Sequence, residues 1–367
     1  MAKTIEEQIK ELEDEISNTK YNKATQAHIG KLKAKIARLS AENEKRRSSK
    51  GPSKGYGVKK AGNATVALIG FPSVGKSTLL NQLTDAKSEV ADYHFTTLDV
   101  VPGVMEHNHA KIQMLDMPGL IRDASRGKGR GREVISAARS ADVILFVVDV
   151  FDPHLHVLIK ELEDAAIRLG QNPPDVVVTP SYRGGISVLS TVKLTKIDED
   201  LARGMVAAYG YVNASVVIRE DIDENQLLDV LTGNRVYIKP LIAVNKIDLA
   251  DPSVLPSVFA KLPDFPKVTV SAQNGTGIED LKDAMFETID LIRVYMKPQG
   301  QEADLEEPLI VRRDSDIGEV CDQIHRTFRP NFRYANIWGP SAKFPGQMVG
   351  IDHVVKDGDI ISIIVKR

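Results

Sequence analysis

An eight-residue glycine-rich segment constrains the fold more than any other part of the sequence. Residues 70–77, Gly-Phe-Pro-Ser-Val-Gly-Lys-Ser, fit the pattern GxxxxGK[ST] at every fixed position. An apolar, β-rich run at 64–69 precedes the segment, and a helix-like run at 77–83 follows it. A strand, a glycine turn and a helix N-terminus direct backbone N–H groups and the helix dipole at one small volume. The sequence therefore predicts an α/β fold with a phosphate-binding loop.

The loop residues have distinct expected roles. The Lys76 ammonium reaches the β- and γ-phosphates of a nucleotide, and the Ser77 hydroxyl coordinates Mg²⁺. A chance glycine loop is the alternative, and the agreement of pattern and context argues against it. The residues expected to line the phosphate site are Gly70, Pro72, Ser73, Val74, Gly75, Lys76, Ser77 and Thr78.

Composition indicates a soluble globular protein. A length of 367 residues leaves room for roughly two to four compact units. The chain carries 48 basic and 50 acidic side chains, so its charge is almost balanced. No apolar run approaches the roughly 20 residues that cross a bilayer, and the N-terminus lacks a signal-peptide core, so we expect no membrane partner. The single cysteine, Cys321, excludes an intramolecular disulfide. A cytoplasmic location is therefore expected.

Cys321 falls at helical spacing with Ile317, Val320, Ile324 and Phe328. This spacing favours a small core residue, and a reactive thiol is the alternative.

The first fifty residues predict two amphipathic helices. Apolar residues recur at spacings of three and four, first over 5–16 and again over 29–39. The polar segment 18–22 between them favours a helical hairpin. Basic residues dominate the span 20–60, which indicates either a solvated helix face with a flexible linker or contacts with an RNA backbone. These basic residues are Lys20, Lys23, Lys31, Lys33, Lys35, Arg38, Lys45, Arg46, Arg47, Lys50, Lys54, Lys59 and Lys60.

Two further motifs follow the phosphate loop in the order typical of a nucleotide switch. The segment 92–98, Asp-Tyr-His-Phe-Thr-Thr-Leu, supplies threonines about twenty residues later. Thr97, with Thr96 as second choice, is expected to bind Mg²⁺ and sense the γ-phosphate. The segment 116–119, Asp-Met-Pro-Gly, follows a strand-like run. Asp116 is expected to hold the metal through water, and the Gly119 N–H to meet the γ-phosphate.

The segment 245–248, Asn-Lys-Ile-Asp, predicts the base that is bound. The Asp248 carboxylate accepts hydrogen bonds from N1–H and the 2-amino group of guanine, which adenine lacks, so the site should reject ATP. Residues 195–198, Thr-Lys-Ile-Asp, nearly repeat the pattern. We prefer the later copy because one more βα unit then leads to Ser-Ala-Gln, whose backbone N–H would meet guanine O6. The base-binding residues are expected to be Asn245, Lys246, Asp248, Ser271, Ala272 and Gln273.

Together these motifs resemble Ras-like GTP-binding proteins of the Obg superfamily, most closely the archaeal and eukaryotic developmentally regulated GTP-binding proteins. The resemblance covers essentially the whole chain and includes the glycine- and arginine-rich segment 126–132. It implies a P-loop, Ras-like GTPase domain with an N-terminal helical hairpin, an inserted small α/β domain and a C-terminal β-grasp TGS domain. It also implies GTP and GDP as ligands, ribosomes with their ribosomal or transfer RNA as partners and, in eukaryotes, a stabilising protein.

The sequence pattern gives these modules approximate boundaries. We expect the helical hairpin with its basic arm at 1–50, a linker at 51–62, the GTPase domain at 63–170 and 239–294, the insertion at 171–238 and the TGS domain at 295–367. Strand-like runs at 176–178, 186–189 and 215–218 and helix-like runs at 201–209 and 224–231 give the insertion its own small core. Its role is either to face a partner or only to add stability.

The sequence of the C-terminal segment predicts a small β-grasp unit. We expect strands at 309–311 and 334–338, a helix at 316–328, and a final hairpin near 357–359 followed by residues 360–365. Arginines interleaved with aromatic residues favour either an RNA-facing surface or a partly buried rim. These residues are Arg326, Arg329, Arg333, Trp338 and Lys343.

The residue after the DxxG motif departs from the simplest GTPases. Leu120 stands where a water-orienting glutamine is frequent, and an apolar side chain cannot orient water, so we expect slow intrinsic turnover. Related enzymes with an apolar residue here use K⁺ held partly by an asparagine, and Ser73 at that place puts potassium in doubt. Candidates for stabilising transition-state charge are Arg122, Arg126, Lys128, Arg130 and Arg132.

The combined hypothesis is a Mg²⁺-dependent GTP hydrolase that acts as a switch in translation, with Lys76, Thr97 and Gly119 as its catalytic groups. A GTP-dependent scaffold that pairs through the N-terminal helices, with incidental hydrolysis, is the alternative. An ATP-driven enzyme would require the Asn-Lys-Ile-Asp segment to be accidental.

Overall fold

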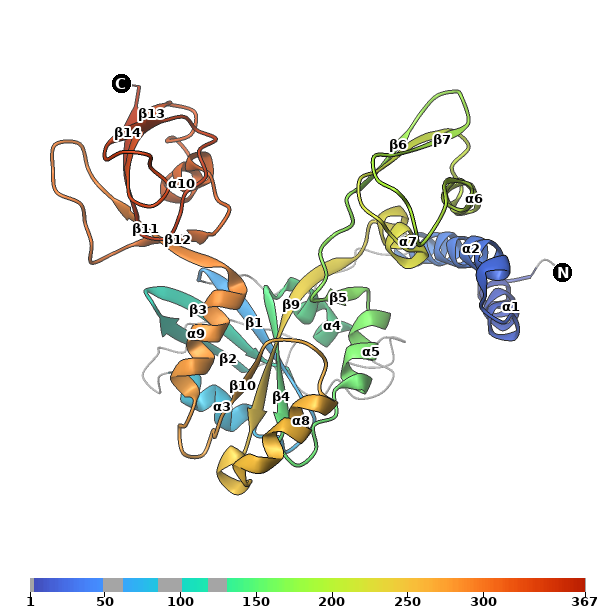
Figure 1. Cartoon of the computed structure of the whole chain (residues 1–367), viewed down its shortest axis with the longest axis horizontal. Helices are drawn as coiled ribbons and strands as arrows, with labels where there is room; N and C mark the ends of the chain where they lie inside the picture. The colour runs from blue at the N-terminus through green and yellow to red at the C-terminus, as the bar shows by residue number, and fades with distance from the viewer. Residues whose placement is uncertain (1–2, 49–61, 85–100, 118–130, 367) are drawn as a thin grey trace. The chain divides into compact units, whose positions relative to one another are not determined.

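The chain forms two compact units. One consists of Met1–Gly55 with Ala166–Tyr237, and the other of Tyr56–Ala165 with Ile238–Arg367. The computed structural model describes residues 3–48, 62–84, 101–117 and 131–366 (Figure 1). The linker 51–61, the segment 85–100 and the segment 118–130 lie outside the described residues.

A mostly parallel sheet forms the centre of the second unit. Six of its strands follow the order β10-β9-β4-β1-β3-β2, in which neighbouring strands are parallel except β2, which runs antiparallel to β3. A short strand, β5 (Ile167–Leu169), also pairs with β9. The main strands are β1 (Ala64–Ile69), β2 (Val101–His107), β3 (Ala110–Asp116), β4 (Val143–Asp149), β9 (Val236–Asn245) and β10 (Lys267–Thr269). The predicted P-loop α/β fold is confirmed.

Helices lie on both faces of this sheet (Figure 1). Because helices cover the sheet on both sides, its central strands are mostly apolar, and β1 is buried at every position, including Thr65. The helices are α3 (Lys76–Leu83), α4 (Gly131–Ser140), α5 (His156–Asp164), α8 (Leu255–Lys261) and α9 (Ile278–Ile289), with short 3₁₀ turns at Ile247–Leu249 and Pro252–Val254.

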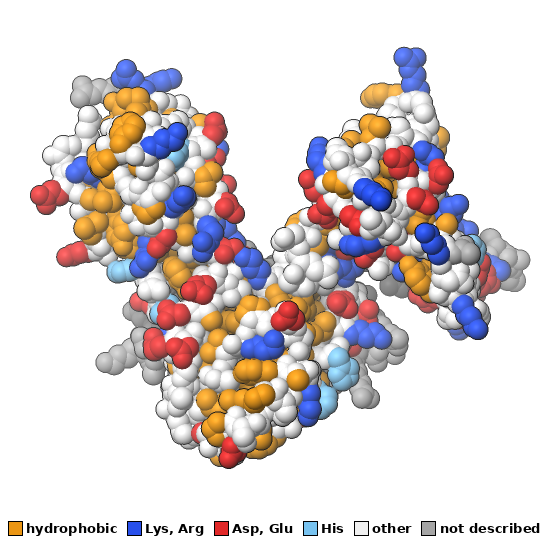
Figure 2. Space-filling model, viewed as in Figure 1, with side chains coloured by type: hydrophobic (Ala, Val, Ile, Leu, Met, Phe, Trp, Pro, Cys, Tyr) orange, Lys and Arg blue, Asp and Glu red, His pale blue; other side chains and the backbone are white. Residues whose placement is uncertain are grey.

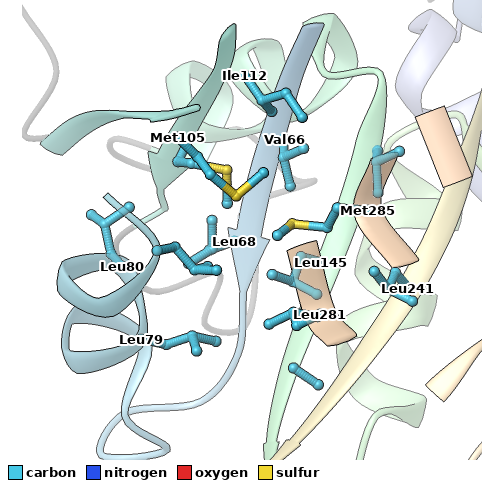
Figure 3. Close-up of a cluster of buried hydrophobic side chains, with 14 of the residues drawn as sticks. Val66, Leu68, Leu79, Leu80, Met105, Ile112, Leu145, Leu241, Leu281 and Met285 are labelled. Atoms are coloured by element: carbon cyan, nitrogen blue, oxygen red, sulfur yellow. The ribbon is translucent and has the colours of Figure 1, made fainter. Parts of the chain in front are cut away.

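The main core fixes β1 and α3, the two elements that flank the phosphate loop. Figure 3 shows Val66 and Leu68 of β1 between Leu79 and Leu80 of α3 and the side chains of α9. All four of these residues are nearly inaccessible to solvent. Close packing of this kind resists displacement, so the loop between β1 and α3 is held at both ends.

The TGS domain is a five-stranded sheet covered on one face by a helix. The strand order is β12-β11-β15-β13-β14, and a compact apolar cluster lies between the sheet and α10. Its elements are β11 (Leu291–Met296), β12 (Leu309–Arg312), α10 (Ile317–Ile324), β13 (Phe332–Trp338), β14 (Gln347–Val349) and β15 (Asp359–Val365).

Two details of the expected TGS structure are wrong. The final hairpin does not form, because β15 pairs in parallel with β11 and antiparallel with β13 rather than with the preceding strand. The buried Asp359 carboxylate instead holds the turn by accepting hydrogen bonds from the N–H groups of Ser341 and Lys356. The helix also ends at Ile324, since His325 is extended, although Phe328 still packs against the cluster.

Cys321 is a core residue, as its spacing predicted. It has no exposed surface and lies in the apolar cluster of the TGS domain. Burial raises the pKa of its thiol to about 11. A neutral thiol is a poor nucleophile, so the expectation of an inert core residue is confirmed.

The N-terminal hairpin and the insertion share one hydrophobic core. The helix α2 packs against α6 and α7, and Ala34 of α2 is buried within the cluster of the inserted domain. The insertion has a three-stranded sheet in the order β6-β8-β7. The elements of this unit are α1 (Ile5–Asn18), α2 (Lys23–Ser48), β6 (Val176–Pro180), β7 (Ile186–Ser190), α6 (Glu199–Tyr209), β8 (Ala214–Ile218) and α7 (Glu224–Thr232).

A buried carboxylate ties both ends of the insertion together. Asp229 on α7 accepts hydrogen bonds from Arg168 on β5 at 2.6 and 2.8 Å and from Arg235, just before β9, at 2.7 Å. The Asp229 side chain is only 4% exposed. A buried charge must be compensated, so this ion triad fixes α7 to the segments that enter and leave the inserted domain.

Within the described ranges, no helix has both the length and the apolar character needed to span a bilayer.

Candidate nucleotide-binding site

The backbone of the phosphate loop accepts only glycine at the two glycine positions of the GxxxxGK[ST] pattern, Gly70 and Gly75. A Cβ atom on Gly70 would lie 2.4 Å from the carbonyl oxygen of Val147. Gly75 has φ of +91° and precedes α3, and a Cβ atom there would lie 2.4 Å from Nδ2 of Asn245. Both contacts are shorter than van der Waals distance, so the loop depends on the absence of side chains.

Lys76 lies at the first position of α3 and turns back into the loop. Its Nζ donates to the carbonyl oxygens of Gly70 at 2.8 Å and Phe71 at 3.0 Å. Burial lowers the pKa of Lys76, and the nearby Asp116 carboxylate opposes this shift. The ammonium is therefore held inside the loop, where phosphate oxygens of a bound nucleotide would meet it.

Ser77 and Asp116 meet at the end of the sheet, although they are 39 residues apart in the sequence. The Ser77 hydroxyl donates to Oδ2 of Asp116 at 2.9 Å. The second carboxylate oxygen, Oδ1, is buried and has no hydrogen-bond partner within the described parts of the chain. An orphaned buried carboxylate oxygen beside a hydroxyl is a donor set that suits Mg²⁺. These two residues therefore fit the expected metal.

Asn245 joins the phosphate loop to the loop after β10. Its Nδ2 donates to the carbonyl oxygen of Val74 at 2.8 Å, and its Oδ1 accepts from the Ala272 N–H at 2.9 Å. The residue is 2% exposed. One side chain thus brings two of the sequence motifs to the same edge of the sheet.

Asp248 and the turn at 271–273 differ in whether their polar groups already make hydrogen bonds within the protein. Asp248 is exposed, and within the described ranges its carboxylate has no ion pair or side-chain hydrogen bond. Ser271 is buried and accepts from the Asn274 N–H at 3.1 Å. The Ala272 N–H already donates to Asn245, so guanine O6 would have to compete for it. Gln273 is exposed on the same turn.

Other predicted site residues are placed as follows. Pro72, Ser73 and Thr78 are exposed around the phosphate loop, and Ser73 has a left-handed φ of +64°. The two threonines at 96 and 97, Gly119 and Leu120 lie outside the described residues, as do the switch-loop basic residues 122–130. The structure therefore brings together the phosphate loop, Asp116, Asn245 and the turn at 271–273.

The second copy of the base-recognition pattern makes contacts within the unit that contains the insertion, and the Lys196 carbonyl oxygen accepts from Gln26 of α2 at 2.8 Å. Asp221 accepts hydrogen bonds from the backbone N–H groups of Thr195 at 2.8 Å and Lys196 at 3.3 Å. Asp198 caps α6 by accepting from the Leu201 N–H at 2.7 Å. These residues therefore have structural partners, and the choice of residues 245–248 as the base-recognition segment stays a prediction.

Asp149 is a residue near the site that the sequence patterns missed. It ends β4 and lies level with Asn245 of β9, and its carboxylate forms an ion pair with Lys246 at 2.7 Å. The signal available in the sequence was the acidic residue that ends the apolar run 143–148. A single carboxylate after a strand is too common to be assigned a role from sequence alone.

The proposed RNA-facing residues have mixed surroundings. On α2, Lys33 donates to Asn225 at 3.0 Å. In the TGS domain, Arg329 is paired with Asp322, Arg333 stacks over Tyr334 at 5.8 Å and Lys297 lies 5.7 Å from the centre of the Trp338 ring. Basic and acidic side chains are interspersed on the face shown in Figure 2.

Comparison with known families divides the chain into three matched regions. A family described as 50S ribosome-binding GTPase matches residues 65–180, and the C-terminal region of that domain matches residues 183–291. The TGS domain family matches residues 292–365. Among solved structures, a GTP-binding protein from Pyrococcus horikoshii OT3 has a TM-score of 0.46 at 16% identity, covering 82% of this chain and 100% of that chain.

Two relatives match the chain from end to end. An uncharacterized GTP-binding protein of Methanocaldococcus jannaschii is 55% identical over 366 residues, which cover 99% of this chain and 93% of that protein. Developmentally-regulated GTP-binding protein 2 of Homo sapiens is 42% identical over 365 residues, which cover 98% of this chain and 99% of that protein. With identity of this extent over nearly the full length, the chain belongs to the family of developmentally regulated GTP-binding proteins.

Proposed function

We propose that the protein hydrolyses GTP to GDP and phosphate with Mg²⁺ and uses this reaction as a switch. The observation that carries the proposal is the pairing of Ser77 with Asp116, whose second carboxylate oxygen is buried and without a partner among the described residues. Such an arrangement costs free energy unless a cation satisfies it. Lys76 lies beside it within the phosphate loop.

Different residues of the chain are proposed to bind the phosphates, the metal ion and the base. Backbone N–H groups of residues 70–77 and the Lys76 ammonium hold the β- and γ-phosphates. Ser77 and Asp116 would hold Mg²⁺, which neutralises phosphate charge when bound. Asp248 accepts from the guanine edge, and Asn245 fixes the loops on either side. Thr97 and Gly119 complete the proposed set by meeting the metal and the γ-phosphate.

Slow intrinsic turnover is part of the proposal. Leu120 cannot orient the attacking water by hydrogen bonding, so positioning depends on backbone groups, on other switch residues or on a bound partner. A potassium ion could serve only with backbone carbonyls in place of an asparagine, because Ser73 occupies that position.

Phosphate release by the purified protein tests the hydrolysis. We expect GTP to be cleaved in Mg²⁺ and not after chelation, and Lys76→Met to lower the rate at least about 100-fold because it removes transition-state charge stabilisation. The matched control is Lys261→Met, since Lys261 is an exposed lysine at the end of α8. Equal rates for the wild type and Lys76→Met would contradict the assignment.

Base choice has its own test. Asp248→Asn should weaken GTP binding and favour xanthosine nucleotides, because the amide presents a donor where the carboxylate presented an acceptor. Unchanged affinity for GTP would reject Asp248 as the base-recognition residue.

We further propose that the switch acts on ribosomes in the cytoplasm. The matched family is described as ribosome-binding, and the chain carries a TGS domain and a basic helix α2, which supply the positive charge that RNA contacts need. A stabilising protein partner is a further expectation from the family.

A GTP-dependent scaffold is the second candidate. The observation that favours it is α1, whose apolar residues Ile5, Ile9, Leu12 and Ile16 are only half-buried. Such a stripe is suited to pairing with another helix. Salt separates the two candidates, because RNA contacts weaken steeply with ionic strength and apolar pairing does not.

A further inference from the structure

Lys246 adopts a backbone conformation that is unfavourable for a residue with a side chain. It follows the last residue of β9 with φ of +65° and ψ of +32°, in the left-handed region. Residues other than glycine, asparagine and aspartate rarely occupy this region, because their Cβ atom approaches the following carbonyl. Something in the surroundings must therefore hold Lys246 in place.

The Asp149 carboxylate is placed to do this. The parallel register of β4 and β9 sets Asp149 opposite Asn245, and Oδ2 of Asp149 accepts from Lys246 Nζ at 2.7 Å. The Asp149 side chain is 17% exposed and that of Lys246 is 32% exposed. Partial burial weakens solvent screening, so this ion pair constrains the lysine more than a surface pair would.

The same carboxylate is itself fixed from the other side. Oδ1 of Asp149 accepts from the Phe151 N–H at 3.0 Å, and its carbonyl oxygen accepts from the Asp152 N–H at 3.0 Å. The Val150 N–H donates to the carbonyl oxygen of Asn245 at 3.1 Å. Both oxygens of Asp149 are therefore used, one for its own loop and one for Lys246.

The left-handed turn determines where the guanine-reading residue lies. After Lys246 the chain enters the 3₁₀ turn Ile247–Leu249, which is closed by the Leu249 N–H donating to the Lys246 carbonyl oxygen at 3.1 Å. Asp248 is the exposed middle residue of this turn. A change in the backbone at Lys246 would move Asp248, so its position depends on the ion pair with Asp149.

We propose that Asp149 is a positioning residue for guanine recognition, which acts by holding Lys246 in the left-handed turn that presents Asp248. Asp149 need not touch the nucleotide. This inference rests on the proposed guanine site at residues 245–248 and adds to it the residue that orders that site before the base arrives. Preorganisation of this kind improves affinity by removing an ordering cost from the binding step.

Equilibrium binding of GDP to the full-length protein tests the proposal. Asp149→Asn keeps the size of the side chain and an acceptor for the Phe151 N–H but removes the charge that holds Lys246. We expect its Kd for GDP to rise about tenfold. The rise in melting temperature caused by magnesium pyrophosphate should stay that of the wild type, because the phosphate loop is separate from this turn. A general loss of structure would reduce both readouts.

A double-mutant cycle tests whether Asp149 affects GDP affinity through Lys246. Lys246→Met removes the same ion pair from its more exposed partner and serves if Asp149→Asn folds poorly. If Asp149 acts through Lys246, the double variant should bind GDP no more weakly than Lys246→Met alone. Asp152→Asn, in the same loop but paired with the exposed His154, is the control and should stay within about twofold of the wild type.

The outcomes separate this inference from the proposed function. If the wild type binds GDP, Asp248→Asn shifts the choice of base and Asp149→Asn binds GDP normally, then Asp149 has no positioning role and the guanine site stands. Additive effects of the Asp149 and Lys246 changes would also overturn the proposal. If the wild type does not bind GDP, both the site and the inference are wrong.

Discussion

The hydroxyl of Ser77 lies 2.9 Å from Oδ2 of Asp116 and donates to it, so the helix after the phosphate loop is linked to the strand that leads into the DxxG motif. The buried Oδ1 of the same carboxylate has no partner among the described residues. In the proposed function this pair is the protein's contribution to the Mg²⁺ site, and it lies next to the lysine that meets the phosphates.

Replacing Asp116 should therefore affect the dependence on magnesium. In Asp116→Asn the amide is a weaker ligand than the carboxylate, so we expect the Mg²⁺ concentration for half-maximal GTP hydrolysis to rise at least about tenfold. The measurement is phosphate release across a Mg²⁺ titration. Asp280→Asn, on the exposed side of α9, is the control. A variant that retained the magnesium dependence of the wild type would rule out Asp116 as part of the metal site.

Gly75→Ala should weaken nucleotide binding. The added Cβ atom would lie 2.4 Å from Asn245 Nδ2, at a residue whose φ of +91° already excludes most side chains. The loop and Asn245 must then move apart, and we expect at least a tenfold loss in GDP affinity. Gly275→Ala is the matched control, since Gly275 also has positive φ but nothing within 4 Å of the added atom. Equal losses of GDP affinity in the two variants would mean that backbone strain, and not the contact with Asn245, weakens binding.

Asp229→Ala should strongly destabilise the unit that contains the insertion. The change leaves Arg168 and Arg235 without their shared buried carboxylate, which costs about 3–5 kcal/mol when one partner of a buried ion pair is removed. Denaturant unfolding of the full chain would measure this loss. The exposed pair of Asp175 with Arg219 provides the comparison, and Asp175→Ala should cause little change. A small effect of Asp229→Ala would show that the triad is not required for stability.

Cys321 should be unreactive in the folded protein. With its pKa raised to about 11 and no exposed surface, the thiolate population at pH 8 is about one in a thousand. A thiol reagent should modify it only after denaturation. Because the pKa in the folded state is above the usual value of 9.0, this group favours the fold below about pH 9, and its contribution is lost as the pH rises toward 11. Rapid labelling of the native protein at pH 8 would contradict the buried placement.

Ala34→Leu should weaken the shared core of the helical hairpin and the insertion. Ala34 has no exposed surface, and the extra methyl groups have no space among the residues of α6. Overpacking of this kind costs about 1–3 kcal/mol. The melting temperature is the readout, and Lys35→Leu, at the neighbouring exposed position, is the control. If Ala34→Leu melts with the wild type, then α2 does not pack on the insertion as described.

Local sequence patterns predicted the elements that carry the site. The strand Ala64–Ile69 has the predicted bounds, because its unbroken apolar run and the glycine that follows are both local signals. The segment 245–248 follows its strand as the pattern indicated, and its role in base recognition stays a prediction. In the near copy at 195–198, Asp198 caps α6. Such features depend on residues close together in the chain.

Contacts between distant residues were not predictable in the same way. Ala34 packs against the insertion, and Asp229 forms ion pairs with Arg168 and Arg235. No local pattern in the sequence indicates that these segments pair. The expected final hairpin was wrong for the same reason, since β15 pairs with β11, which is more than sixty residues earlier. Asp149 was missed because its role depends on the register between β4 and β9. The module boundaries given from sequence stay predictions.

We propose that GTP controls binding of the protein to ribosomes, and co-sedimentation of the purified protein with ribosomes tests this proposal most directly. The protein is incubated with a non-hydrolysable GTP analogue, with GDP or without nucleotide, each at low and moderate salt. The account predicts preferential pelleting with the GTP analogue and weaker pelleting at moderate salt, as contacts with RNA phosphates require. Absence of pelleting in every nucleotide state, or equal pelleting in all three, would contradict a GTP-controlled switch on the ribosome.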